Sequence, residues 1–327
     1  MITREALASD VSRRRQKATG CLVGLAVGDA MGDIARTDSY RQRYGIITNL
    51  YEGARSTDDT EFAILTARTL LDCEGKLTPE HLLASWRRYI LEQGGLKERA
   101  GRPLYGAVAN LQRGVLPPLS GQDNVLNYDD GAAMRVAPIG IICAGNPRQA
   151  AAMAKIDAEI SHDSDGIWAA QAVAASIAVA MVDGTPEEIV EAGLRQIPTD
   201  SWLGRAMARA MRICDEEGAI EDAWERLHSE LWTPAHAASP EAVPQLYAVF
   251  RLTGGDFRQG MFWGCNFGRD ADTIAAIIGA MAGARQGIES IPEAWIDKVR
   301  RPGGVCLRFA AQEDVVDLAQ QLAELIR

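Results

Sequence analysis

The stretch that decides the fold is GCLVGLAVGDAMG at residues 20–32, in which every fourth residue is glycine. A second such row, Gly279, Gly283 and Gly287, lies near the other end of the chain. Because a glycine inside a helix costs about 0.5–1 kcal/mol relative to alanine, such rows indicate that another backbone approaches closely. Dimerising membrane helices share the spacing, but charged residues such as Asp29 interrupt these rows. The rows therefore predict two tightly packed central helices in a soluble bundle.

Helical periodicity recurs along the rest of the chain, whereas alternating β-branched runs are rare. The Gly- and Pro-rich breaks are short enough to be loops between helices, and none resembles a domain linker. An all-α fold is therefore predicted. Ala-rich stretches with helical spacing occupy residues 61–72, 149–158, 166–182, 203–216 and 271–286.

Charge and composition exclude several classes of protein. With 34 basic and 44 acidic residues, the formal net charge of -10 works against binding to a phosphate backbone, so nucleic acid is not an expected partner. The six cysteines form no CxxC pair and have no histidine at zinc-ligand spacing, which favours reduced, buried thiols. The N-terminus lacks the apolar core of a signal peptide, and no segment has eighteen apolar residues in a row. A cytoplasmic location without membrane contact is expected.

Two acidic segments each lead into an apolar helical run: STDDTE at residues 56–61 and GRDADT at residues 268–273. Each is typical of a helix start, because hydroxyls accept free N–H groups there and carboxylates favour the positive end of the helix dipole. Two such starts also allow a second interpretation. Carboxylates and threonine hydroxyls from two converging helix ends are the hard oxygen ligands that Mg²⁺ prefers. Spacing alone does not show that the two segments meet.

Four motifs in order resemble the ADP-ribosylglycohydrolases, a family that includes the dinitrogenase-reductase-activating glycohydrolases. They are GLAVGDAMG (24–32), TDDT (57–60), GAAMRVAPIG (131–140) and GRDADT (268–273), and the resemblance covers roughly residues 18–298. It implies a single compact all-α domain over residues 1–327, an orthogonal helical bundle. It also implies cleavage of the N- or O-glycosidic bond between ADP-ribose and an acceptor. The substrate would be an ADP-ribosylated protein or a smaller ADP-ribose or riboside conjugate.

By motif position, the resemblance also implies a binuclear Mg²⁺ centre; Mn²⁺ accepts the same ligands. The metal ligands would be Thr57, Asp58, Asp59, Asp270, Asp272 and Thr273, and the four aspartates would carry catalysis. The residues expected to line the substrate pocket are Gly106, Asp130, Gly131, Ser161 and His162.

Several of these placements have a structural alternative. The two pocket glycines could supply only unusual backbone angles, and His162 could cap a helix or satisfy a hydrogen bond in the core. Met134 is expected in the core. Arg135 could contact a phosphate or anchor a neighbouring carboxylate.

One position departs from the family pattern. Arg36 stands where the family usually has a glutamate, and a guanidinium neither accepts a proton from water nor coordinates Mg²⁺. Asp33, Asp38 and Glu52 are nearby carboxylates that could compensate, and Arg269 would add a second cation beside the centre. A hydrolase is the leading hypothesis. The alternatives are a metal-dependent protein that binds ADP-ribose or a nucleotide without turnover, and a purely structural helical protein. The oligomeric state is left open.

Overall fold

The computed structural model describes residues 1–327 and consists of α-helices and short 3₁₀ helices without a β-strand. The predicted all-α class is confirmed. The α-helices are α1 (Arg4–Ser9), α2 (Val11–Arg36), α3 (Asp38–Tyr44), α4 (Asp58–Asp72), α5 (Pro79–Tyr89), α6 (Arg102–Gln112), α7 (Leu119–Gln122), α8 (Ala137–Ile142), α9 (Pro147–Ala158), α10 (Asp165–Ala180), α11 (Pro186–Leu194), α12 (Trp202–Glu217), α13 (Ile220–Leu231), α14 (Ser239–Leu252), α15 (Phe257–Cys265), α16 (Ala271–Gln286), α17 (Glu293–Val299) and α18 (Val315–Ala323). The 3₁₀ helices are Leu91–Gln93, Ala133–Arg135, Ile288–Ser290 and Arg308–Gln312.

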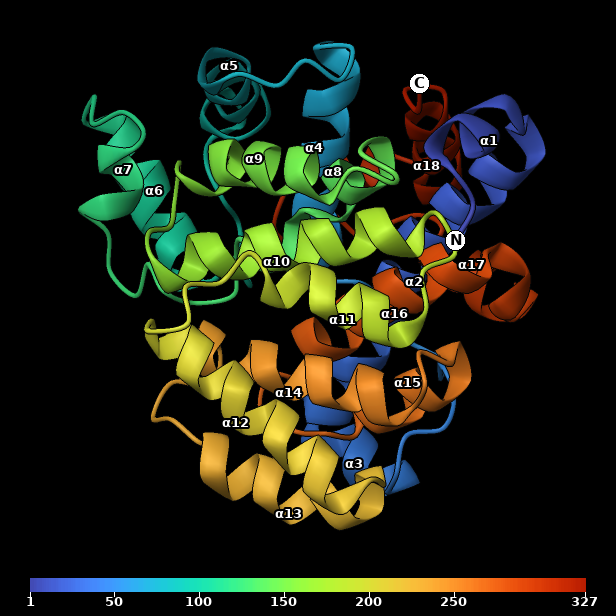
Figure 1. Ribbon diagram of the computed structural model, residues 1–327. Helices are drawn as coiled ribbons and strands as arrows, with labels where there is room; N and C mark the ends of the chain where they lie inside the picture. The colour runs from blue at the N-terminus through green and yellow to red at the C-terminus, as the bar shows by residue number, and fades with distance from the viewer.

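At the centre, α2 and α16 lie side by side in opposite directions (Figure 1). The glycine rows bring the two backbones together: a Cβ atom added to Gly24 would lie 2.2 Å from the carbonyl oxygen of Gly279. A Cβ atom added to Gly28 would lie 2.1 Å from the carbonyl oxygen of Ala275. No side chain fits at such distances, so these positions require glycine. The predicted pair of central helices is confirmed.

Gly287, the last glycine of the second row, has a further role at the end of the helix. It follows the last residue of α16 with a φ of 80°, and the nearest atom to an added Cβ would be 3.8 Å away. A residue with positive φ just after a helix ends that helix, and glycine adopts this conformation without steric strain. Gly287 therefore terminates α16, and its backbone also packs in the glycine row, since a Cβ atom added to Gly20 would lie 2.6 Å from the carbonyl carbon of Gly287.

The other helices wrap around this pair. In Figure 1, α10 and α11 cross in front of it, α12 to α15 lie below, and α4, α5, α8 and α9 lie above. One hydrophobic core of 101 buried residues runs through these layers. The two ends of the chain lie on the same side, where Arg4 Nε donates a 2.6 Å hydrogen bond to the carbonyl oxygen of Arg327. The predicted helical stretches all fall on helices, although the one at 166–182 runs two residues past the end of α10.

Helix α2 is the one helix long and apolar enough to cross a membrane by length and composition. Within its most apolar window, 94% of the residues are buried inside the protein. Core helices of soluble proteins have the same character, and the contact with α16 accounts for the apolar surface of α2. The expected cytoplasmic location and the absence of a membrane partner stay predictions.

Candidate functional site

Two helices begin at the site without a cap of their own. Thr57 precedes α4 and Asp270 precedes α16, and neither side chain accepts a hydrogen bond from its helix. Capping therefore does not explain why these polar residues stand there. Glu61 turns away from the site and accepts backbone N–H bonds from residues 305–307, at 2.6–2.8 Å.

Asp29 on α2 supplies the missing cap for α4. One carboxylate oxygen accepts the Thr57 hydroxyl at 2.6 Å, and the other accepts the backbone N–H of Thr57 at 2.6 Å and the Thr60 hydroxyl at 2.6 Å. Burial raises the pKa of Asp29 to about 7, although these bonds lower it. Because Asp29 follows Gly28, the helix pair that places α16 also places the start of α4. This role of Asp29 was not predicted; the available signal in the sequence was a carboxylate inside an apolar glycine row.

Replacing Asp29 with asparagine is expected to destabilise the protein by about 2–3 kcal/mol, because the amide N–H₂ group would face buried donors. The family resemblance implies a metal centre at the start of α4, which Asp29 positions, so the substitution should also lower metal affinity about 10–100-fold. Urea denaturation and Mn²⁺ titration measure the two effects. Asp215→Asn is the matched control, since that side chain is 63% exposed. Unchanged metal affinity in a folded Asp29→Asn protein would contradict the positioning role.

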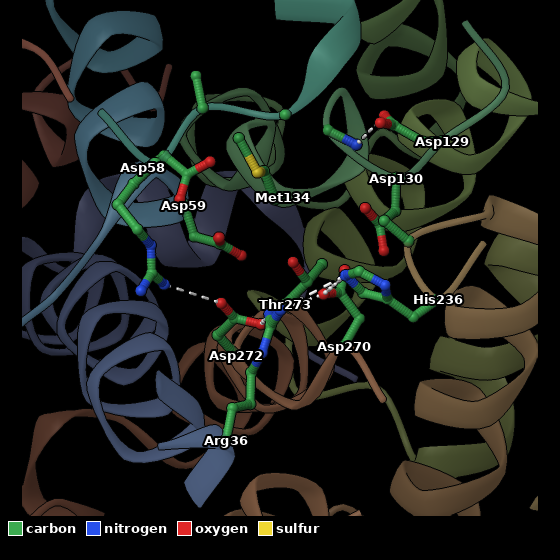
Figure 2. Close-up of a pocket in the computed structure, with 15 residues that line it drawn as sticks. Arg36, Asp58, Asp59, Asp129, Asp130, Met134, His236, Asp270, Asp272 and Thr273 are labelled. Carbon is green, nitrogen blue, oxygen red and sulfur yellow. Dashed lines mark hydrogen bonds and ion pairs between the residues drawn. The ribbon is translucent and has the colours of Figure 1, made fainter. Parts of the chain in front are cut away.

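The starts of α4 and α16 open on one cavity of about 200 Å³. Figure 2 shows Asp58 and Asp59 on one side of it, Asp270, Asp272 and Thr273 on another, and Asp130 and His236 toward a third. The two acidic segments, more than two hundred positions apart, therefore meet in space. The lining residues are Arg36, Asp58, Asp59, Arg99, Ala100, Gly101, Asp129, Asp130, Gly131, Met134, His236, Ala237, Asp270, Asp272 and Thr273.

Arg36 reaches into this cavity from the last residue of α2. Its Nη1 atom lies 2.8 Å from Asp270 Oδ1 and also pairs with Asp272 Oδ1 (Figure 2). Its Nη2 atom lies 3.4 Å from the imidazole of His236. The guanidinium therefore bridges two of the predicted metal ligands.

The carboxylates of the cavity are held in an environment that disfavours their charge. Burial, and then the charges of Asp29 and Asp272, raise the pKa of Asp59 well above its usual value. The pKa of Asp58 is raised in the same way, by burial and then by Asp272 and Asp29. Burial raises the pKa of Asp270 to about 6, although Arg36 opposes the shift. Carboxylates crowded in this way gain from a bound cation.

Two carboxylate oxygens in the cavity lack any partner: Asp59 Oδ1 and Asp130 Oδ2. Both residues are almost fully buried, with exposed fractions of 2% and 3%. A buried polar atom without a hydrogen bond is uncommon and points to a bound ion, water or ligand group. At the same time, no group of three or more His, Cys, Asp or Glu side chains is arranged to hold a metal ion.

Only some of the predicted metal ligands and substrate-binding residues meet in the cavity. Of the six proposed metal ligands, five line the cavity, and Thr57 lies behind it against Asp29. Of the proposed substrate residues, Asp130 and Gly131 line the cavity, and Gly106, Ser161 and His162 do not.

The structure decides among the alternatives for His162 and Arg135. His162 Nε2 lies 2.7 Å from Asp129 Oδ1, and its pKa is lowered by burial, so it is a core hydrogen-bonding residue beneath the cavity wall. Arg135 is fully buried; its Nε donates to Asp157 Oδ1 at 2.6 Å and its Nη2 to Ser161 at 3.1 Å. Arg135 therefore anchors a carboxylate and has no access to a phosphate. Met134, expected in the core, is buried but also lines the cavity.

Arg269, expected as a second cation beside the centre, precedes Asp270 but does not line the cavity. Its side chain pairs with the buried Glu241 and donates to the carbonyl oxygen of Thr233 at 2.6 Å, away from the cavity. The second cation is Arg99, which has a φ of 69° in a loop without periodic pattern. Arg99 Nη2 lies 2.6 Å from Asp33 Oδ1 and 3.5 Å from Asp272 Oδ2.

The three carboxylates proposed to compensate for Arg36 do not line the cavity. Asp33 is held by Arg99, and Asp38 and Glu52 are absent from the lining. His236, in the loop before α14, does line it and was not predicted. No local sequence pattern marks that position.

Comparisons with known proteins place these observations in a family context. A family model described as ADP-ribosylglycohydrolase matches residues 10–327. The chain is 32% identical over 297 residues to an uncharacterized protein of Archaeoglobus fulgidus, covering 87% of this chain and 92% of that one. It is 24% identical to the ADP-ribosyl-[dinitrogen reductase] glycohydrolase of Rhodospirillum rubrum, covering 86% and 90%, and 25% identical to the ADP-ribosylarginine hydrolase Tri1 of Pseudomonas putida, covering 94% and 80%.

The fold is also found in a solved structure, an ADP-ribosylglycohydrolase-related protein complex. That chain superposes with a TM-score of 0.66 at 22% sequence identity, covering 97% of this chain and 100% of the other. The predicted type of helical bundle is therefore confirmed.

Proposed function

Since the chain belongs to the ADP-ribosylglycohydrolase family, we propose that it hydrolyses the glycosidic bond between ADP-ribose and an acceptor, with the help of a divalent cation. The substrate is an ADP-ribosylated protein side chain or a smaller ADP-ribose or riboside conjugate. Two relatives are named for hydrolysis of ADP-ribose from dinitrogen reductase and from arginine, which supports this class. The observation that carries the proposal is the pair of buried, unpartnered oxygens, Asp59 Oδ1 and Asp130 Oδ2, in the acidic cavity.

The oxygen donors in the cavity are of the type that Mg²⁺ and Mn²⁺ prefer. Asp58, Asp59 and Thr273 offer hard oxygen atoms from two helix starts, and Asp270 and Asp272 offer more where Arg36 leaves them free. When bound, the cation would orient the ribose hydroxyls and lower the pKa of the attacking water. Asp130, whose pKa is raised by burial and by Asp270, is suited to hold a proton for the departing atom.

The volume of the cavity limits how much of the substrate it can hold. About 200 Å³ suits a ribose and its cation, not a whole ADP-ribose. A second cavity of about 380 Å³ shares Gly101, Asp129 and His236 with the first and is further lined by Arg102 and Tyr128. The rest of the substrate is proposed to extend there.

A product assay tests this function. The purified protein is incubated with ADP-ribosyl-arginine, ADP-ribosyl-serine, O-acetyl-ADP-ribose and simple ribosides, with Mg²⁺ or with EDTA, and products are identified by mass spectrometry. Free ADP-ribose that appears with Mg²⁺, is lost with EDTA, and is lost in Asp270→Ala supports the proposal. Release of ribose or base from a simple riboside alone would indicate a different glycosidase.

A second candidate function is metal-dependent binding of ADP-ribose or a nucleotide without turnover. The ion pairs of Arg36 with Asp270 and Asp272 favour it, because they occupy carboxylates that catalysis would use. Binding of ADP-ribose by calorimetry, with no product from any substrate, would support it. Turnover abolished by Asp270→Ala would exclude it.

A further inference from the structure

We infer that the Arg36 guanidinium takes the place of one divalent cation, so that the cavity binds a single metal ion beside Asp58 and Asp59 where the family resemblance implies two. This inference rests on the proposed function in one respect, since it takes the cavity to bind a divalent cation. It concerns the number of ions and not the reaction.

The first argument is the set of contacts on the Arg36 side. Asp270 and Asp272 are about 5% exposed, and each turns one oxygen to Arg36 Nη1. The other oxygen of Asp272 lies 3.5 Å from Arg99, and Asp270 Oδ1 also lies 3.5 Å from His236 Nε2. Nitrogen atoms of Arg36, Arg99 and His236 therefore already lie within 3.5 Å of these two carboxylates. A guanidinium has no lone pair for a metal, and its charge repels a cation held by the same oxygens.

The second argument is the opposite side of the cavity. The ion pairs of Arg36, Arg99 and His236 all end on Asp33, Asp270 or Asp272, and none ends on Asp58 or Asp59. Asp59 Oδ1 is buried without any partner, and Asp58 and Asp59 are neighbours on the first turn of α4. Among the proposed metal ligands, Asp58 and Asp59 are therefore the carboxylates without an ion pair.

The third argument is charge. Changing Arg36 to glutamate alters the local charge by two units, which is the charge of one divalent cation. A folded Arg36→Glu protein should accordingly accept a second ion. Arg36→Gln frees Asp270 and Asp272 without adding a carboxylate, so it should also accept a second ion, with lower affinity.

The experiment counts bound Mn²⁺ by equilibrium dialysis and elemental analysis of wild type, Arg36→Glu, Arg36→Gln and a control. The control is Arg300→Gln, which removes an ion pair with Asp314 at 2.6 Å in a residue that does not line the cavity. We expect one ion per chain for wild type and control, and two for Arg36→Glu. Circular dichroism melting establishes that each variant is folded, and Arg36→Gln decides the question if the glutamate variant does not fold.

The outcomes separate the ion count from the reaction. Two ions on the wild type, or no second ion on any folded Arg36 variant, would overturn the inference while leaving the hydrolase proposal to its own product assay. No ion on the wild type would overturn the inference together with the metal dependence of the proposed function. One ion on a wild type that releases no product would support the inference and count against the hydrolase.

Discussion

Asp59→Asn is expected to lower the rate of ADP-ribose release about 10³-fold while making the metal-free protein more stable. A bound cation contributes several kcal/mol of transition-state stabilisation, and each 1.36 kcal/mol is a factor of ten in rate. The stability gain follows from burial, which raises the pKa of Asp59, with the charges of Asp29 and Asp272 adding to it. At neutral pH the folded protein must therefore either protonate this group or bury its charge. Asparagine has the same shape and no charge.

Initial rates and thermal melting measure the two effects, with EDTA present during the melt. The melting temperature should rise by about 2 °C or more, since about 1 kcal/mol corresponds to 2–4 °C in a large domain. Asp200→Asn, at an exposed position in the turn before α12, should change neither quantity. Wild-type turnover in Asp59→Asn would show that this carboxylate has no part in the reaction.

Gly28→Ala is expected to destabilise the protein by at least about 3 kcal/mol. The new methyl carbon would lie 2.1 Å from the carbonyl oxygen of Ala275 and 2.6 Å from the nitrogen of Ala276. Overfilling a core usually costs about 1–3 kcal/mol when side chains can shift, but here the obstacle is a helix backbone. Since domains are stable by only about 5–15 kcal/mol, this loss is a large fraction of the free energy of unfolding.

Urea denaturation of purified protein measures this loss. Gly303→Ala is the control, because Gly303 is exposed and the nearest atom to an added Cβ there lies 3.5 Å away. A Gly28→Ala protein within 1 kcal/mol of wild type would show that the two helices can move apart. Any surviving folded fraction should also have reduced metal affinity, since Gly28 precedes Asp29.

The fold could be predicted from sequence because its main determinants are local patterns. Glycine at every fourth position marks a close helix contact wherever the partner lies, and the two rows identified α2 and α16. The sequence spacing did not show that Gly287 also ends the helix, because spacing alone does not mark the last helical residue. The end of the helix depends on φ, which is 80° at Gly287.

The site was harder to predict because it is made by contacts between distant segments. The two acidic helix starts were found from their composition. The prediction that they meet in space depended on the family resemblance. Arg99 and His236 were missed because they lie in loops, where no periodicity constrains a side chain. For Arg36, chemistry alone excluded metal binding, but only the structure shows that its guanidinium bridges Asp270 and Asp272.

The pairing of α2 with α16 also sets an order of events during synthesis. Lys17 on α2 donates its Nζ proton to the carbonyl oxygen of Ala284, 267 residues later. At about 5–20 residues per second, the ribosome needs on the order of tens of seconds to deliver α16 after α2 has emerged. Throughout that interval the long apolar helix α2 lacks its main packing partner. Cellular yield should therefore depend on chaperones that shield this N-terminal segment during translation.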